Sequence, residues 1–111
     1  MNVALAMTAA LLAIAPLAAS GQRADTSPAA DGQVAFRRYC GGCHLTQGFG
    51  TRTLARRVPA EQAKLEDRRD LTAEYVRMAV RHGLGSMPPI RRSELDDTTL
   101  ASVGAYLEKS K

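Results

Sequence analysis

One five-residue segment constrains this chain more than any other feature: Cys40-Gly41-Gly42-Cys43-His44. It contains both cysteines of the chain, and a histidine directly follows the second one. At this spacing the two thiols lie about one helical turn apart. The imidazole is their direct neighbour, so three groups that bind metals or form covalent bonds are confined to one short stretch of backbone.

The pattern C-x-x-C-H is the attachment signature for c-type haem. The two thiols add to the haem vinyl groups, and thioether bonds then fix the macrocycle at Cys40 and Cys43. His44 is thereby held beneath the iron, to which it gives an imidazole nitrogen. Gly41 and Gly42 let the backbone approach the porphyrin closely. The motif predicts one covalently bound haem c, with His44 as an iron ligand.

Other uses of the two thiols compete with haem. A redox dithiol of the thioredoxin type needs a βαβ setting, which the chain shows no strand pattern to supply. A plain disulfide would close a very short loop and would constrain the unfolded chain only weakly. Zinc would find only three ligands in Cys40, Cys43 and His44, and the other histidine, His82, lacks the usual paired spacing.

The first twenty residues have the pattern of a secretory signal peptide. They carry no charged side chain, and the apolar run from Val3 to Leu17 is followed by the small residues 18–20. We expect cleavage near Ser20 and a periplasmic protein. An uncleaved anchor is the alternative, because the segment before the apolar run lacks Lys and Arg. The run is short for spanning and contains Pro16, so no stable membrane span is expected.

The remaining residues suit one small domain, with 21–30 as a flexible lead-in and 31–111 as the folded part. Trp is absent, so a largely apolar haem would supply much of the core surface. The net charge of +4 belongs entirely to this part of the chain. Such a balance favours acidic protein partners. No basic helix with base-reading spacing appears, so nucleic acid is not expected.

Three helices and several connecting segments are predicted within the folded part. Asp31 suits the cap of a helix from Gly32 towards Cys40. Gln47–Thr51 is glycine-rich and predicts a loop, while Leu54–Glu66 contains Pro59 and favours only short helical turns. The apolar surface of the first helix is expected from Val34, Ala35, Phe36 and Tyr39.

The clearest helix follows Leu71. Thr72 suits its cap and Gly83 its end. Its apolar face is expected from Tyr75, Val76, Ala79 and Val80. Pro88 and Pro89 then require an extended loop. Asp96 suits the cap of a last helix to Glu108, with Leu100, Val103, Tyr106 and Leu107 on its buried side. No strand pattern is present, so the chain is predicted to be an all-α domain.

Met87 is the candidate for the second iron ligand. It lies on an irregular loop after a helix, where the following prolines stiffen the backbone and present the side chain. Its thioether is a soft ligand, and a Met/His pair raises the reduction potential of haem iron. Met78 and His82 are the alternatives, although Met78 suits a core position and His82 the end of a helix dipole.

Together these residues resemble a small class I cytochrome c, and the resemblance runs from Gly32 to Leu107. It rests on Gly32-x-x-x-Phe36 before the haem motif, Met87-Pro88 after a helix, and Val103-x-x-Tyr106-Leu107. The family implies a class I cytochrome c fold, with three to five helices around one covalently bound haem. Carried over, Gly32 lets the helix of Tyr106 approach. The expected haem pocket residues are Val76, Val80, Leu54 and Pro88.

The family often has Gly-Pro after the haem motif, where the proline carbonyl orients the ligand histidine. Here the loop is Gly48-Phe49-Gly50. Another backbone carbonyl is therefore expected to accept the Nδ1–H of His44.

A narrower resemblance concerns the strings Arg68–Arg77 and Val80–Pro89. They are similar to cytochrome subunits of flavoprotein dehydrogenases of the 4-cresol methylhydroxylase and eugenol hydroxylase type. This implies a redox partner that is a flavoprotein oxidising phenols. The chain would then be an electron acceptor rather than an enzyme.

Three functions follow from these observations. The first is single-electron transfer by a periplasmic mono-haem cytochrome that accepts electrons from a dehydrogenase, without catalytic residues of its own. The second is a haem-based ligand-binding or peroxidase-like protein with a labile sixth ligand, in which Tyr75 or His82 serves as a polar group. The third is an interaction module with a structural disulfide. Paired arginines are typical of solvated surface, but one or two near the haem edge are expected to bind propionates or dock a partner. Arg52 is the candidate for a haem propionate and Arg91 for partner docking.

Overall fold

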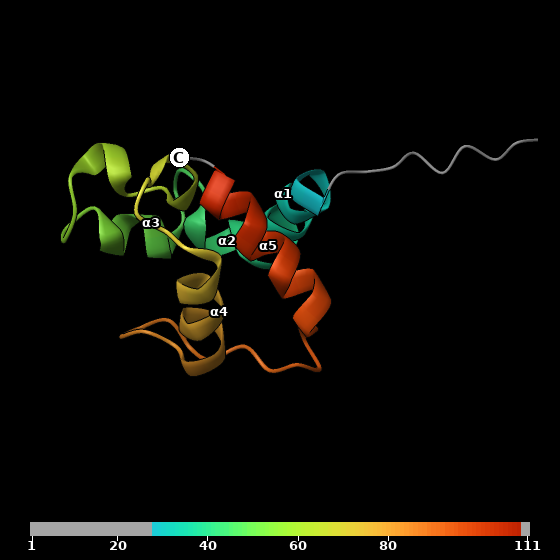
Figure 1. The fold of residues 1–111 in the computed structure, drawn as a ribbon. Coiled ribbons are helices and arrows are strands. Elements are labelled where there is room, and N and C mark those ends of the chain that lie inside the picture. Colours follow the sequence, from blue (N-terminus) through green and yellow to red (C-terminus); the bar gives the residue numbers. More distant parts are fainter. Residues whose placement is uncertain (1–27, 110–111) are drawn as a thin grey trace, which may run out of the picture.

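The computed structural model describes residues 28–109, and these residues form helices but no strand (Figure 1). In chain order the elements are α1 (Pro28–Tyr39), α2 (Gly41–His44), α3 (Phe49–Leu54), η1 (Ala60–Gln62), η2 (Leu65–Asp67), α4 (Ala73–His82) and α5 (Asp97–Lys109). The prediction of an all-α fold is confirmed. The expected signal peptide and most of the expected lead-in lie outside the described residues.

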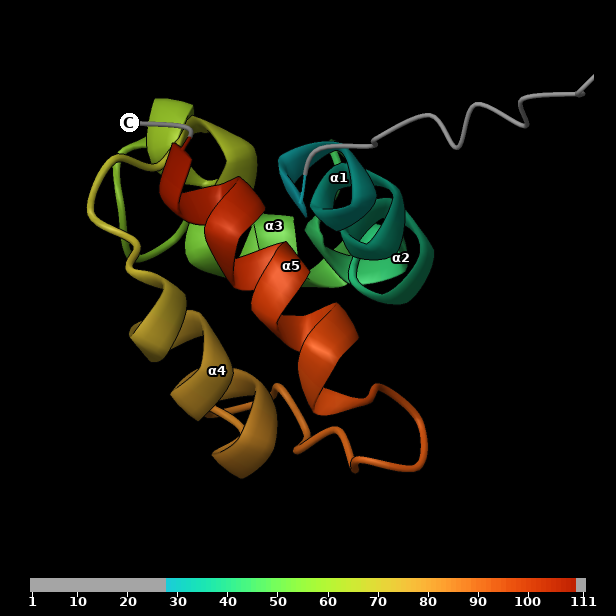
Figure 2. The ribbon, with the colours of Figure 1, turned by 45° about the vertical axis from the view of Figure 1, so that its right-hand side comes forward.

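The first and last helices cross in direct contact (Figure 2). A Cβ atom placed on Gly32 would lie 2.1 Å from the carbonyl oxygen of Ser102 and 2.7 Å from Cβ of Tyr106. Only glycine fits this crossing, because any side chain would force the two backbones apart. Beside it the rings of Phe36 and Tyr106 lie with their centroids 5.9 Å apart. The expectation that Gly32 lets the helix of Tyr106 approach is confirmed.

The core lies where α4 and α5 meet α1. Its largest fully buried side chains are Phe36, Leu95, Leu100, Val103 and Leu107. Val76 and Val80 of α4 are also buried there, and Leu100, Val103 and Leu107 bury the predicted face of α5. The prediction for α4 was wrong at Tyr75, which is 42% exposed. The prediction for α1 was partly wrong, because Val34 is 69% exposed and Tyr39 is 40% exposed. The buried face of this helix includes Ala35 and Phe36 but not these two residues.

The ends of α4 and the start of α5 follow local signals in the sequence. The Thr72 hydroxyl accepts a hydrogen bond from the Tyr75 N–H at 3.1 Å, as a helix cap does. Gly83 ends α4 with a φ of 76°, a value that favours glycine. An Asp96 carboxylate oxygen accepts from the Thr99 N–H at 2.8 Å at the start of α5. These predicted boundaries are confirmed.

Two predicted boundaries were wrong. The first helix begins at Pro28 rather than Gly32, so Asp31 lies within its first turn instead of capping it. A proline is well suited to a helix start because its missing N–H would have no partner there. The segment predicted as a glycine-rich loop contains the start of α3 at Phe49. This short helix is held to the preceding loop, since the Thr51 hydroxyl donates to the Leu45 carbonyl at 2.8 Å.

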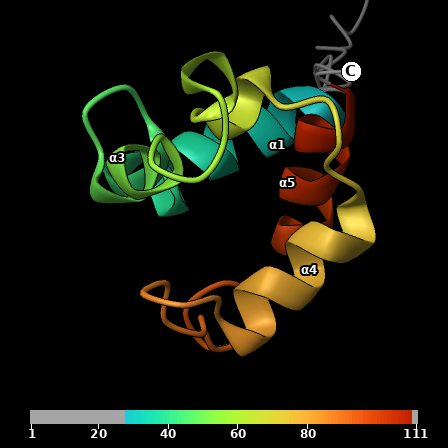
Figure 3. The same cartoon turned by 90° about the vertical axis from the view of Figure 1, so that its left-hand side faces the viewer.

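The fold brings two distant parts of the chain to one side. In Figure 3, α3 and the loop that follows α4 extend to the same side of the α1–α5 pair. Across residues 28–109, every helix is too short or too polar to cross a membrane.

Candidate functional site

A cavity of about 410 Å³ lies between the cysteine–histidine segment, α3, α4 and the loop after α4. Its volume falls in the range of about 300–1,000 Å³ that is usual for sites of small molecules and cofactors. Most of its wall is apolar. The aliphatic and aromatic residues on the wall are Phe36, Phe49, Leu54, Leu65, Leu71, Tyr75, Val76, Ala79, Val80, Leu84, Val103 and Leu107.

All eight site residues expected from the sequence lie on the wall of this one cavity. They are Cys40, Cys43, His44, Leu54, Val76, Val80, Met87 and Pro88. These residues come from two parts of the chain, 40–54 and 76–88, which the fold brings together. The two alternative iron ligands, Met78 and His82, are not on this wall. The surrounding geometry therefore favours Met87 over both of them.

The two cysteines continue directly from α1, because the Cys40 N–H donates to the Phe36 carbonyl at 2.8 Å. Both are free thiols, with Cys40 half-buried and Cys43 exposed. Burial, together with the nearby Cys43, raises the pKa of the Cys40 thiol to about 11. Redox dithiols of the thioredoxin type depend instead on a lowered thiol pKa. The environment of Cys40 therefore disfavours that reading of the motif.

Zinc is disfavoured as well. Within residues 28–109, no three His, Cys, Asp or Glu side chains converge in a way that could hold a metal ion. The cysteines and His44 thus face one cavity as separate groups and do not form a compact metal centre of the kind zinc requires.

His44 lies against the backbone of the following loop. Burial lowers the pKa of its imidazole, which favours the neutral ring that can bind a metal. A Cβ atom on Gly50 would lie 2.8 Å from Cε1 and 3.0 Å from Nδ1 of this ring. The absence of a side chain at Gly50 is therefore what makes room for the imidazole.

The prediction of a carbonyl acceptor for His44 was wrong. Nδ1 is buried and has no hydrogen-bond partner among the described residues. The glycine-rich turn packs tightly, since a Cβ on Gly48 would lie 2.1 Å from the Cys43 carbonyl oxygen and one on Gly50 would lie 3.0 Å from Nδ1 of His44. Close packing in the turn, rather than a hydrogen bond to Nδ1, limits where the imidazole lies.

Met87 lies at the end of a tight turn that begins at Gly83. The Leu84 N–H donates to the Met87 carbonyl at 3.0 Å, and the Met87 N–H donates to the Leu84 carbonyl at 2.9 Å. A Cβ on Gly83 would lie 2.6 Å from the Met87 carbonyl oxygen, so the turn closes over a glycine. Met87 is half-buried and packs against the hydrophobic core. The backbone of the turn therefore places its side chain on the cavity wall.

The arginines that line the cavity are not the one that the sequence singled out, Arg52. Arg57 and Arg68 line it, and each belongs to an arginine pair of the kind that is typical of solvated surface. Arg52, expected beside a haem propionate, does not line this cavity. It lies on a neighbouring cavity of about 380 Å³, whose wall is formed by Phe49, Arg52, Thr53, Arg56, Arg57 and Ser86. The sequence alone does not show which arginine side chains face a cavity, and only the structure distinguishes them.

The donor set suits haem c. Two free thiols, an imidazole and a thioether share one apolar cavity. These are the groups that attach and ligate c-type haem.

Comparison with known proteins gives one family. The family model for cytochrome C oxidase, cbb3-type, subunit III matches residues 27–107, a span that contains every site residue described above. No curated protein and no solved structure matches the chain.

Proposed function

Since the chain belongs to the cytochrome C oxidase, cbb3-type, subunit III family and is a small c-type cytochrome, we propose that it transfers single electrons on one covalently bound haem c. One observation carries the proposal. Cys40, Cys43, His44 and Met87, which lie up to 47 residues apart, line the same apolar cavity.

Each of these residues has a specific role in the proposal. Cys40 and Cys43 would hold the haem by thioether bonds, and His44 and Met87 would provide the two iron ligands. When bound, the haem supplies a one-electron ferric and ferrous couple. The thioether of Met87 raises the reduction potential, and the apolar wall around Val76 and Val80 limits access of water. In this account no residue acts as a general acid, base or nucleophile.

A ligand-binding or peroxidase-like function is the second candidate. Tyr75 favours it to a limited degree, because its side chain is on the cavity wall and 42% exposed. His82, the other polar group suggested for this role, is exposed and absent from the wall. Electron transfer is favoured because Met87 lines the same cavity as His44 and is available as a second protein ligand, which a labile site would lack.

Attachment of haem through the two cysteines has a direct test. The full chain is expressed with haem-attachment machinery and denatured, and its mass is measured by mass spectrometry. The wild-type protein is expected to retain the mass of one haem after denaturation. Cys40→Ala with Cys43→Ala is expected to lose it completely. A denatured wild-type protein without bound haem would contradict the proposal.

The redox partner is proposed to be an acidic protein that docks at the mouth of the cavity. Phe49 and Leu84, both on the cavity wall, are 56% and 44% exposed. Arg52, Arg56 and Arg57 lie beside Phe49 on the neighbouring cavity. No carboxylate among the described residues forms an ion pair with these three arginines. An apolar patch with positive charge at its rim is typical of protein interaction sites.

Partner reduction kinetics test this surface. Arg56→Glu is expected to slow the reaction with an acidic redox partner and to flatten its dependence on ionic strength. Arg77→Glu is the matched control, since it makes the same charge change on an exposed part of α4 away from both cavities. Equal effects of the two substitutions would show that only net charge matters.

The particular electron donor is proposed from the narrower resemblance: a periplasmic flavoprotein dehydrogenase that oxidises phenols. This part of the proposal has its own test, in which the purified ferric protein is mixed with a reduced dehydrogenase of this type. Rapid reduction supports the assignment, and reduction no faster than that of an unrelated cytochrome contradicts it.

Export to the periplasm is also proposed, on the basis of the apolar segment before Ser20. The mass of the mature protein recovered from the periplasm is expected to show cleavage near that residue. Recovery of the intact chain from membranes would favour an uncleaved anchor.

A further inference from the structure

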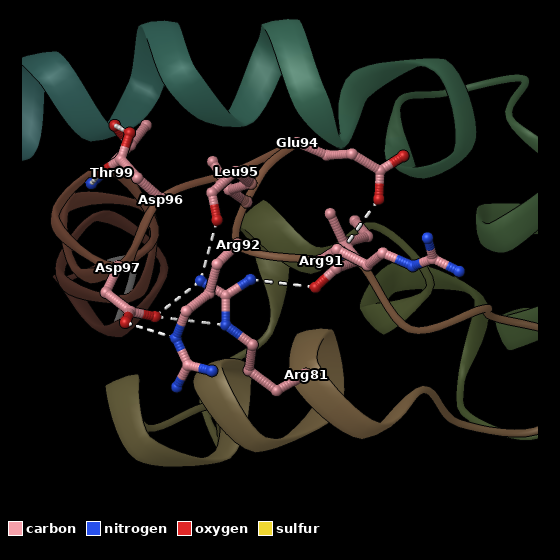
Figure 4. A network of polar contacts seen from close by, with 9 residues as sticks. Arg81, Arg91, Arg92, Glu94, Leu95, Asp96, Asp97 and Thr99 are labelled. Atoms are coloured by element: carbon pink, nitrogen blue, oxygen red, sulfur yellow. Dashed lines mark hydrogen bonds and ion pairs between the residues drawn. The ribbon is translucent and has the colours of Figure 1, made fainter.

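Arg81 connects α4 to the segment that follows the Met87 turn (Figure 4). Its side chain is only 11% exposed, although arginine at a helix end is usually solvated. Nη1 donates to the Ile90 carbonyl at 2.9 Å, and Nη2 donates to the Leu95 carbonyl at 2.8 Å. Both acceptors belong to the irregular stretch between the turn and α5, so this guanidinium supports a backbone with few bonds of its own.

The same guanidinium reaches the start of α5. Nη2 and Nε donate to Oδ1 of Asp97 at 2.7 and 3.3 Å. Asp97 is fixed from its other side by Arg92, whose Nε donates to Oδ2 at 2.7 Å. The planar guanidinium, with its fixed set of N–H donors, suits an arrangement in which two loop carbonyls and one carboxylate converge. Arg81 thus joins α4, the segment after the turn, and α5 at a single point.

The Met87 turn needs such support because the segment directly after it has few main-chain N–H donors. Pro88 and Pro89 carry no N–H, so the chain after Met87 can donate no main-chain hydrogen bond until Ile90. The Ile90 N–H then donates to the Val80 carbonyl at 2.8 Å. Its carbonyl accepts from Arg81, so Ile90 is held from both sides to the last turn of α4.

We propose that Arg81 is a positioning residue that keeps the Met87 side chain at the cavity by fixing Ile90, three residues further along the chain. This inference rests on the proposed function, in which Met87 binds the iron. Without the guanidinium, the carbonyls of Ile90 and Leu95 lose a charged donor. The conformation in which the turn is displaced from the cavity is then populated in a larger fraction of molecules. A soluble ligand that competes with Met87 then binds more tightly, in proportion to the fraction of molecules with the turn displaced.

Imidazole titration of the ferric, haem-loaded full chain measures this fraction. Displacement of Met87 is followed by loss of the far-red band that a methionine ligand gives to ferric haem. Arg81→Met is expected to bind imidazole at least tenfold more tightly than the wild type, which corresponds to about 1.4 kcal/mol. Arg81→Lys keeps a charge but loses the planar fork, and is expected to fall between the two.

Two controls separate positioning from general effects. Arg92→Met removes the other donor to Asp97 but touches neither loop carbonyl, so its imidazole affinity is expected to stay within about twofold of the wild type. Thr72→Ala weakens the opposite end of α4 and lowers overall stability. Its affinity for imidazole, measured well below the melting temperature, is expected to remain that of the wild type.

The outcomes are distinct. A wild-type protein without the far-red band would contradict ligation by Met87 itself, and this inference with it. A wild type with the band and an Arg81→Met variant of unchanged affinity would contradict the role of Arg81 alone, as would equal shifts in Arg81→Met and Arg92→Met. If Arg81→Met does not fold, Arg81→Lys decides, and a wild-type affinity in that variant overturns the proposal.

Discussion

Replacing Gly32 with alanine tests whether the close crossing of α1 and α5 holds this fold together. The new Cβ would lie 2.1 Å from the Ser102 carbonyl oxygen and 2.7 Å from Cβ of Tyr106. Ordinary van der Waals contacts of a Cβ atom begin near 3.4 Å. The crossing must therefore open by about 1 Å, since both obstructing groups are part of, or next to, the backbone of α5.

The expected cost follows from three opposing or additive effects. Overpacking at a close contact costs about 1–3 kcal/mol. Opening the crossing also weakens the Phe36–Tyr106 ring pair, a contact worth about 0.5–1.5 kcal/mol. The higher helix propensity of alanine returns up to about 1 kcal/mol. Taken together, Gly32→Ala should lower the free energy of unfolding by about 2 kcal/mol, which for a domain of this size is a fall in Tm of about 8–16 °C.

Urea unfolding of the haem-loaded protein, followed by far-ultraviolet circular dichroism, measures this loss. Val34→Ala is the matched control, because it places alanine on the same helix at a residue that is 69% exposed. The control is expected to be as stable as the wild type or up to about 0.7 kcal/mol more stable, since alanine has the higher helix propensity. If Gly32→Ala proved as stable as Val34→Ala, the argument from the helix crossing would be refuted.

Other predictions concern a cap, the histidine and acid stability. Thr72→Ala should lower the free energy of unfolding by about 0.5–2 kcal/mol, measured in urea, because it removes the cap of α4; an unchanged midpoint would contradict the cap. Gly50→Ala should displace the His44 ring and shift the reduction potential, which potentiometry would detect; an unshifted potential in a folded variant would show that the ring has room to move. Hydrogen bonds from Thr99 lower the pKa of Asp96, and hydrogen bonds from the two nearby arginines lower that of Asp97. The stability that these carboxylates confer is therefore fully present above about pH 4 and lost as the pH falls through their lower folded pKa values. Unfolding across a pH series should show this loss, and it should be reduced in Asp96→Asn; a flat profile below pH 4 would contradict it.

The helices with strong local signals were predictable from the sequence. Thr72 lies at the start of α4, Gly83 lies at its end, and Asp96 precedes α5. These ends were predictable because a cap or a terminal glycine acts within one turn of the helix. The start of α3 was missed, since the glycines near Phe49 suggest a loop. Their role is tertiary: Gly48 and Gly50 make room for the Cys43 carbonyl and the His44 ring, contacts that no local pattern encodes.

The site was predictable to the extent that its chemistry is carried by rare residue types. The cysteine–histidine motif and Met87 stand out by identity and context, and the structure brings them to one cavity. Arginines are frequent and their long side chains reach in many directions, so the sequence pointed to Arg52 but did not single out Arg57 and Arg68, which line the cavity. Arg81 lies in the last turn of α4, and only its contacts with the carbonyls of Ile90 and Leu95 show its role.

The optical spectrum of the haem-loaded protein, oxidised, reduced and exposed to carbon monoxide, tests most directly whether His44 and Met87 both bind the iron. The wild type is expected to show the far-red methionine band when ferric and no response to carbon monoxide when ferrous. Met87→Ala is expected to lose the band and bind carbon monoxide readily. A wild-type protein that lacks the band and reacts with carbon monoxide would contradict the electron-carrier account and favour a ligand-binding haem site.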